Sequence, residues 1–427
     1  MNPATPASLA DRFRALRHRD FRLFWLGQLI SVMGTWMQAV AQGWLMHRLT
    51  DSAMMLGLLA FTQFLPVSVF SLWAGVVVDA MDKRRLILIT QSLAMLQAVI
   101  LAVLVSLHLV QPWMILVLAF ALGTIHAFDL PARQAFLVEL VGGKEDLSNA
   151  IALNSAAFNA ARVLGPSLAG ILLAWLGEAV CFWSNALSFI AVLVSLGMMR
   201  VRSRVDEPRR FADALRSVGE GVRYSWNVGA IRNLLLLLGV TCGLGFQYTT
   251  LLPVYAREIL HGGAPAYGLM VSAFGVGSLM SAVLMTRRQD RWALRRNLLI
   301  GLGSAGFGMA MFALSRVLWI TLVMGFFAGF GLILYVASTN TLLQLTTEDR
   351  FRGRVMSLYT LMFIGTAPIG ALLSGWIAQR WGAPFATGLC SLVLLGGALW
   401  ISYRLRVIAA REAAATPTDA AHAEAVQ

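Results

Sequence analysis

Uncharged apolar runs of about 20 residues recur along the whole chain. An α-helix needs roughly 20 such residues to cross a ~30 Å hydrocarbon core, because every backbone amide must be hydrogen-bonded within its own segment. Hydrophobic residues make up 58% of the 427 residues and charged residues only 13%. We therefore predict an all-α polytopic membrane protein with twelve spans: 22–46, 54–78, 86–107, 112–137, 149–175, 179–199, 231–255, 266–286, 297–314, 317–342, 354–378 and 384–404.

Arginine and lysine gather in every second loop. They precede the first span, separate the second from the third, fill the interval 200–230 and recur before the ninth and eleventh spans. Cytoplasmic loops carry the excess of Lys and Arg, so we expect both termini and the 200–230 interval to be cytoplasmic. The net charge of +13 then reflects topology and contact with anionic lipid heads of the bilayer, and we expect no nucleic acid partner.

The longest polar interval divides the chain into two sets of six spans. We expect a cytoplasmic N-terminal segment (1–21), a first six-helix half (22–199), a basic central loop (200–230), a second half (231–404) and a cytoplasmic tail (405–427). Within the loop, FADALRSVGEGVRYSW places apolar and charged residues at helical spacing. This pattern predicts an interfacial helix, with a flexible linker as the alternative.

The two halves share a pattern at an offset of 205 residues. The segment that starts at Asn149 aligns with the one that starts at Arg354. The coinciding glycines are Gly165 with Gly370, Gly170 with Gly375, and Gly177 with Gly382. Parallel repeats of this kind build transporters with a site between the halves, near the bilayer midplane. Chance similarity between two glycine-rich helices is the alternative.

Several chemistries have no support in the sequence. A Gly-x-x-x-x-Gly-Lys-Ser/Thr loop does not occur, so transport would run on an ion gradient rather than on ATP. Cys181, Cys242 and Cys390 all fall inside predicted spans, and the six histidines are scattered. We therefore expect no cofactor, no metal site and no enzymatic activity.

The loop after the second span holds a charged motif. It reads Gly75-Val-Val-Val-Asp79-Ala-Met-Asp82-Lys83-Arg84-Arg85. This resembles a hallmark of the major facilitator superfamily, although Ala80 and Asp82 depart from the usual pattern. The resemblance implies a latch between the halves that closes one face of a transporter. Gly75 would allow two helices to approach closely, and Asp79 would pair with an arginine, for which Arg133 is the best local candidate.

A longer resemblance covers essentially the whole chain. It is carried best by the segments Asp129-Leu-Pro-Ala-Arg133-Gln-Ala-Phe136 and Asn149 to Gly170. These are similar to the branch of the superfamily that contains enterobactin exporters and macrolide efflux permeases. The resemblance implies the major facilitator fold, with two pseudo-symmetric six-helix halves, in a bacterial inner membrane. Because one chain supplies both halves, we expect it to function as a monomer, although the sequence leaves the oligomeric state open.

Within this resemblance, Gly165, Pro166 and Gly170 lie where antiporters of the superfamily carry a Gly-Pro motif. Proline bends the helix there, and the glycines permit close packing. The motif favours export over uptake.

Two ionisable residues lie deep inside predicted spans. The helical rise places Asp129 about 13 Å and Arg162 about 20 Å from the cytoplasmic side, so we expect them to pair. Asp129 is the first candidate for a proton carrier, because release from its partner would favour protonation; a static pair that fixes helix packing is the alternative. The arginine that many proton-coupled members carry early in the fourth span is missing, which leaves the coupling ion open.

Amide and aromatic side chains are spread over the spans. They suit an amphipathic organic solute, because hydrogen bonds orient it and rings supply contact area. The candidates are Gln38, Gln42, Gln63, Asn154, Asn159, Asn185, Gln247, Tyr248 and Asn340. Each is alternatively an interhelical hydrogen bond.

The sequence thus predicts a secondary transporter. Proton-coupled export of a siderophore, a macrolide or another amphipathic drug by alternating access is the leading hypothesis. Proton-coupled uptake of a metabolite, and a membrane sensor or scaffold that moves no solute, are the alternatives.

Overall fold

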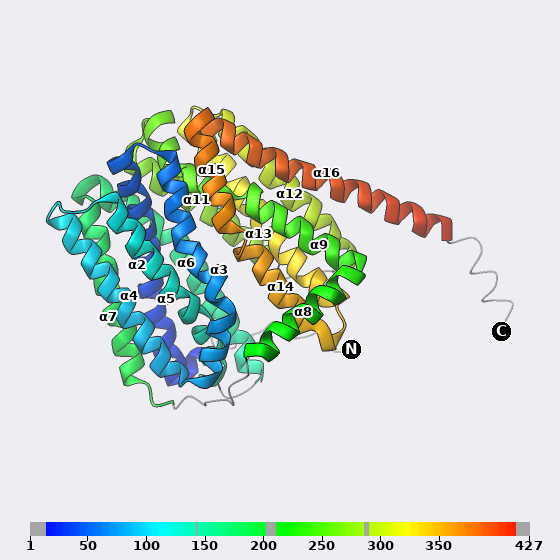
Figure 1. Cartoon of the computed structure of the whole chain (residues 1–427), viewed down its shortest axis with the longest axis horizontal. Helices are drawn as coiled ribbons and strands as arrows, with labels where there is room; N and C mark the ends of the chain where they lie inside the picture. Colours follow the sequence, from blue (N-terminus) through cyan, green and yellow to red (C-terminus); the bar gives the residue numbers. More distant parts are fainter. Residues whose placement is uncertain (1–13, 142–143, 202–210, 286–289, 416–427) are drawn as a thin grey trace.

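The chain forms a bundle of long helices (Figure 1). A computed structural model describes residues 14–141, 144–201, 211–285 and 290–415, and these residues form helices and no strand. Within them, twelve helices or series of helical segments are long and apolar enough to cross a membrane. The predicted fold class is confirmed.

The first half consists of six continuous helices. They are α2 (Arg19–Thr50), α3 (Ala53–Ala80), α4 (Lys83–Ser106), α5 (Pro112–Glu139), α6 (Lys144–Leu176) and α7 (Glu178–Met198), preceded by a short turn of 3₁₀-helix (Arg14–Arg17). Side chains define where several of them begin. Ser52 caps α3 by accepting a bond from the Met55 amide, and Asp82 caps α4 by accepting one from the Arg85 amide.

The second half contains two interrupted spans. Its continuous helices are α11 (Gly263–Leu284), α12 (Arg291–Leu314), α13 (Leu318–Thr346) and α16 (Ala383–Ala415). The seventh span is a series: α9 (Gly229–Val240), η2 (Thr241–Gly245), η3 (Gln247–Leu251), α10 (Leu252–Val254) and η4 (Tyr255–Ile259). The eleventh consists of α14 (Asp349–Ile364) and α15 (Ala367–Trp381). We predicted uninterrupted spans at both places; glycines and prolines weaken the helix there.

The packing repeats from one half to the other. In the first half α3 packs on α5, and α4 packs on α5 and α7. In the second half α11 packs on α13, and α12 packs on α13 and α16. In each half, therefore, the second span packs on the fourth, and the third span packs on the fourth and the sixth. The two halves are pseudo-symmetric, as the repeat predicts.

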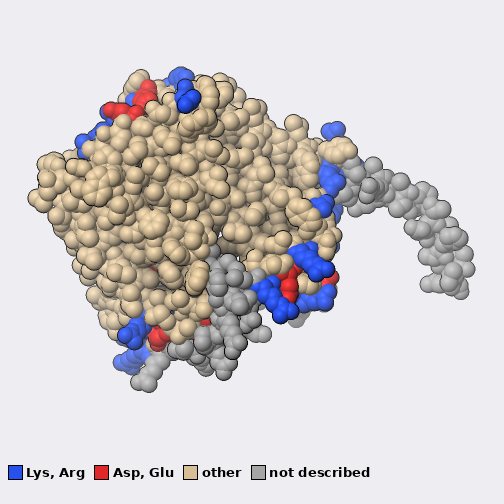
Figure 2. All heavy atoms as spheres, in the orientation of Figure 1, with Lys and Arg blue, Asp and Glu red and all other residues tan. Residues whose placement is uncertain are grey.

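Two ends of the bundle can be named by their residues. The basic face is the end where α2 begins at Arg19, α4 at Lys83 and α12 at Arg291. The opposite face is the end where α2 ends at Thr50 and α15 ends at Trp381. Figure 2 shows charged side chains along the upper edge and around the lower and right edges, with a broad uncharged area between them. That area is as expected for a surface in contact with lipid tails.

Helix α8 (Phe211–Asn227) lies at the basic face and packs on α14 (Figure 1). The Tyr224 and Phe351 rings stack with centroids 4.1 Å apart. Arg354 forms an ion pair with Glu220 at 2.8 Å. These contacts attach α8 to the second half.

The same turn occurs twice, at the opposite face, 205 residues apart. Gly177 joins α6 to α7 with φ 79°, and Gly382 joins α15 to α16 with φ 87°. Their ψ angles of −179° and 155° place both in a region that only glycine adopts readily. The backbone therefore preserves the repeat that the aligned glycines indicate.

We expect Gly177→Ala and Gly382→Ala each to lower the free energy of unfolding by about 1–3 kcal/mol, because a Cβ disfavours this backbone conformation. The cost is conformational, since a Cβ at Gly177 meets nothing within 4 Å and one at Gly382 meets only Pro384, at 3.7 Å. Thermal unfolding of the purified protein in detergent would measure it. Gly388→Ala is the control, because Gly388 is helical and equally open. Unfolding temperatures at or above that of the parent would contradict the prediction.

Candidate functional site

The two halves meet through glycines at two crossings. Where α6 crosses α11, a Cβ at Gly170 would lie 3.0 Å from the Gly268 Cα. Where α3 crosses α15, a Cβ at Gly375 would lie 2.8 Å from the Gly57 Cα. Gly170 and Gly375 are partners in the 205-residue repeat. Only glycine fits at such backbone contacts, so each repeat supplies one crossing.

Polar contacts join the halves at the opposite face. Arg257 donates from Nη1 to Asp51 Oδ1 at 2.6 Å. Ser52 donates from Oγ to Gln379 Oε1 at 2.9 Å. His47 lies buried beneath them, with its Nε2 3.0 Å from Glu258 Oε1. Together with the glycine crossings, these contacts close this face.

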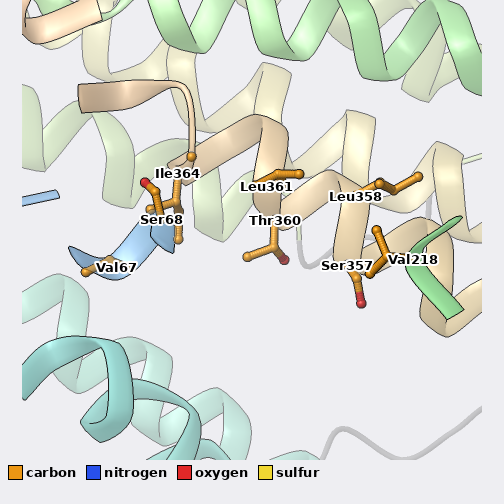
Figure 3. Close-up of a pocket in the computed structure, with 9 residues that line it drawn as sticks. Val67, Ser68, Val218, Ser357, Leu358, Thr360, Leu361 and Ile364 are labelled. Carbon is orange, nitrogen blue, oxygen red and sulfur yellow. The ribbon is translucent and has the colours of Figure 1, made fainter. Parts of the chain in front are cut away.

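Toward the basic face, a groove opens between α3, α8 and α14. Its cavity volume is about 240 Å³. Val67 and Ser68 of α3 line one side, and Leu361 and Ile364 of α14 lie across from them (Figure 3). The halves are thus in contact at the opposite face, whereas a groove separates α3 from α14 nearer the basic face.

The Gly-Pro motif of α6 serves two contacts. A Cβ at Gly165 would lie 2.7 Å from the Trp36 Cβ on α2. A Cβ at Gly268 would lie 2.7 Å from the Pro166 carbonyl oxygen. The motif therefore packs α6 inside its own half and against the other half. The expectation for Gly75 is wrong, because among the described residues nothing lies within 4 Å of a Cβ placed there, so Gly75 makes no close contact with a described helix.

The basic residues of the charged motif bind within the first half. Arg84 donates from Nε to the Leu196 carbonyl at 2.9 Å and from Nη2 to the Gly197 carbonyl at 3.1 Å. It thereby caps the C-terminal end of α7. Lys83 forms a buried ion pair with Glu139 at 3.2 Å. Arg85 is exposed.

Asp129 is the centre of a buried polar cluster in the first half, and is 3% exposed. Its Oδ1 accepts bonds from Thr90 Oγ1 at 2.6 Å and from Gln91 Nε2 at 2.9 Å. Its Oδ2 accepts a bond from Arg133 Nε at 2.6 Å. The predicted Asp129–Arg162 pair is wrong: the arginine one turn along α5 is close enough to take that place. Pairing of Arg133 with Asp79 stays a prediction.

Arg162 instead lies between aromatic rings of both halves. Its Cζ is 5.6 Å from the ring centroid of Trp36 on α2 and 4.9 Å from that of Phe274 on α11. Such cation–π contacts hold a guanidinium where few polar partners exist. Sequence reasoning missed Phe274, because nothing in the spacing indicates which face of α11 meets α6.

Two of the predicted amides of the first half, Gln38 and Asn185, belong to a chain of side-chain hydrogen bonds. Gln38 donates from Nε2 to Gln97 Oε1 at 3.0 Å, and Asn185 donates from Nδ2 to Gln38 Oε1 at 2.8 Å. All three are buried. Gln42 is buried near the opposite face, and its Nε2 has no partner among the described residues. Gln38 and Asn185 therefore link helices within the first half.

The other candidate amides are less enclosed. Gln63 and Asn154 are half-buried. Asn159 donates from Nδ2 to the Ser155 carbonyl at 2.8 Å, and Asn340 accepts from Gln344 Nε2 at 2.6 Å. These bonds are local, within one helix each.

In the second half, two predicted residues lie in the interrupted seventh span. Gln247 donates from Nε2 to the Cys242 carbonyl at 2.8 Å, which satisfies a backbone group that the irregular helix leaves free. Tyr248 is 1% exposed, and its ring meets Phe274 edge-on at 5.8 Å. Tyr248 is thereby brought to the same cluster of rings as Arg162.

Comparison with known proteins yields consistent relatives. The staphyloferrin A transporter of Staphylococcus aureus is 28% identical over 376 residues, covering 84% of this chain and 90% of that protein. The multidrug efflux pump Tap of Mycolicibacterium fortuitum is 27% identical over 390 residues, covering 88% and 94%. A crystal structure of a POT family transporter with a thioalcohol-conjugated peptide superimposes with a TM-score of 0.70 at 12% identity, over 92% of this chain and 96% of that one.

A family model described as transmembrane secretion effector matches residues 10–427. That match spans nearly the whole chain, and it agrees with the twelve spans and the paired halves. The chain belongs to the transmembrane secretion effector family of the major facilitator superfamily, whose members are transporters and not enzymes.

Proposed function

We propose that this protein exports an amphipathic small molecule by alternating access, in exchange for protons. The observation that carries the proposal is the uneven contact between the halves. Glycine crossings and polar bonds close the opposite face, while a groove opens between α3 and α14 toward the basic face. A transporter that works by rocking two halves passes through such a state.

The arginine distribution supports an orientation for this state. If the basic face is cytoplasmic, both termini and the 200–230 interval lie inside, and the structure is open to the cytoplasm. That is the state in which an exporter of a bacterial inner membrane collects its substrate. One chain supplies both halves, at 22–199 and 231–404, which supports function as a monomer.

The relatives support the direction and the substrate class. One is named for a siderophore and another for multidrug efflux. The ring cluster around Arg162 supplies apolar contact area, which suits an amphipathic solute better than a small metabolite.

Asp129 is the proposed proton carrier. In this state its carboxylate accepts bonds from three donors, so it acts as an acceptor only. Proton uptake requires that Arg133 leave Oδ2 in another state of the cycle. Because Asp129 bonds to α4 and to its own helix, rearrangement of the first half would couple its protonation to rocking.

We expect a reversible cross-link at the opposite face to stop transport. Ser52→Cys with Gln379→Cys places two thiols across the halves, where the native side chains bond at 2.9 Å. A short reducible thiol cross-linker should abolish efflux from cells that lack their own pumps, and reduction should restore it, because the halves can no longer separate there. Each single cysteine variant is the control. Undiminished efflux after complete cross-linking would contradict alternating access.

Proton coupling predicts a specific effect of Asp129→Asn. The parent should extrude macrolides, dyes or siderophores in a protonophore-sensitive manner. The rate of this efflux should be at least about ten-fold lower in the variant. Substrate exchange across reconstituted liposomes at equal pH should persist, because it needs no net proton movement. Asp290→Asn is the control, since Asp290 caps α12 and lies outside both the cluster and the charged motif.

Equal loss of exchange and of driven efflux in Asp129→Asn would indicate a structural role for the cluster. Accumulation of solute in cells that express the parent would favour uptake over export.

A further inference from the structure

Arg162 is a charge in a place where charges are costly. It lies about four turns before α6 ends at Leu176, near the middle of the spanning segment. Charged residues at that depth cost several kcal/mol and are kept for a function. Among the described residues, the guanidinium has neither an ion pair nor a hydrogen-bond partner, and its contacts are the Trp36 and Phe274 rings. Its five N–H donors are therefore available to a ligand.

A second buried polar group without a hydrogen-bond partner in the part of the chain that the structure describes, the Tyr248 hydroxyl, belongs to the same cluster of rings. Tyr248 is 1% exposed, and its hydroxyl has no hydrogen-bond partner among the described residues. Both groups contact the same ring, because the Phe274 ring centroid lies 4.9 Å from the Arg162 Cζ and 5.8 Å from the Tyr248 ring centroid. Leaving a buried hydroxyl unbonded costs about 1–3 kcal/mol. Arg162 and Tyr248 thus supply two donors without an acceptor in the described residues, one from each half. A bound ligand with an acceptor group would satisfy both.

The chemistry of the donors selects the ligand group. A guanidinium offers a planar fork of N–H groups that fits a carboxylate with two parallel bonds, and the Tyr248 hydroxyl adds a third donor. Neutral acceptors would gain less at a cation that lacks a counter-charge. Phe158, one turn from Arg162 on α6, is 44% exposed and meets Trp36 edge-on at 6.1 Å. The rings therefore offer a surface for an apolar body next to the anion site.

We propose that Arg162 and Tyr248 form a receptor for a carboxylate of the transported molecule, with Trp36, Phe158 and Phe274 in contact with its apolar part. This rests on the proposed transport function and adds a substrate class, amphipathic carboxylates. The site joins the halves, because Trp36 and Arg162 come from the first and Phe274 and Tyr248 from the second. Bound substrate would thereby contact both bodies that move.

Paired probes test the proposal. Rhodamine 110, fusidic acid and deoxycholic acid each have a methyl ester that lacks only the anionic charge. Thermal unfolding of the purified protein in neutral detergent should shift upward by several degrees with at least one acid, and by less than half as much with its ester. Equal shifts within every pair, or no shift with any probe, would overturn the proposal.

Variants separate a receptor from a structural clamp. Arg162→Gln and Tyr248→Phe should remove the preference for the acid, while the unfolding temperature without ligand stays equal to that of the parent or rises. The reason is that the first change removes a buried charge and the second a buried hydroxyl, and neither has a hydrogen-bond partner among the described residues. A fall of the ligand-free value with the acid preference intact would overturn the proposal. Arg380→Gln is the control, since Arg380 lies over the Trp376 ring at 5.3 Å near the opposite face.

The same pairs measured as efflux keep the two proposals distinct. Export of both acids and esters by the parent at equal rates would leave the proposed function standing and overturn the carboxylate receptor. Protonophore-sensitive export that favours the acids, and that Arg162→Gln reduces at least ten-fold for the acids alone, would establish both.

Discussion

Helices in a bilayer gain little from hiding apolar surface from each other, because the lipid tails are as apolar as their side chains. What holds two halves together is close backbone packing, and that requires residues without side chains. The crossings of Gly170 with Gly268 and of Gly57 with Gly375 meet this need. Both lie between mid-depth and the opposite face, so the halves are joined there, and the groove between α3 and α14 lies on the way to the basic face. The glycine crossings therefore lie at the end where the halves are in contact in this structure.

The two deep charges of the first half have opposite surroundings. Asp129 has a donor for each oxygen and belongs to a closed cluster of α4 and α5. Arg162 faces rings of α2 and α11 and has no counter-charge among the described residues. A charge that is fully hydrogen-bonded can change its partner only if existing bonds break. A charge without a partner is stabilised when a partner binds. On the proposals made above, coupling therefore depends on Asp129 and binding on Arg162, whereas the sequence had suggested that the two residues pair.

Much of the fold could be predicted from sequence because membranes restrict it. Spans follow from hydropathy, since no other backbone arrangement than a helix satisfies its amides in these segments. Of the four glycines at the crossings, the sequence indicated Gly170 as a packing position and Gly375 as its repeat partner, but it did not single out Gly57 or Gly268.

The sequence does not show how each helix is rotated about its axis, and this rotation determines which side chains meet at the site. Asp129 meets Arg133 on its own helix, and Gly75 faces open space. The interruptions of the seventh and eleventh spans were also missed, although Gly243, Gly245 and Gly365 mark them, because a hydropathy average over 20 residues ignores single helix breakers.

Two halves with the same fold would offer similar surfaces to a ligand held between them, and such a ligand would have two orientations of similar energy. The charge at Arg162 removes this equivalence, because the residue at the 205-residue offset is Ala367, the first residue of α15. At the proposed receptor, a molecule with one anionic end would therefore bind in a single direction. A duplicated fold with one unmatched charge would in this way give its solute a defined polarity.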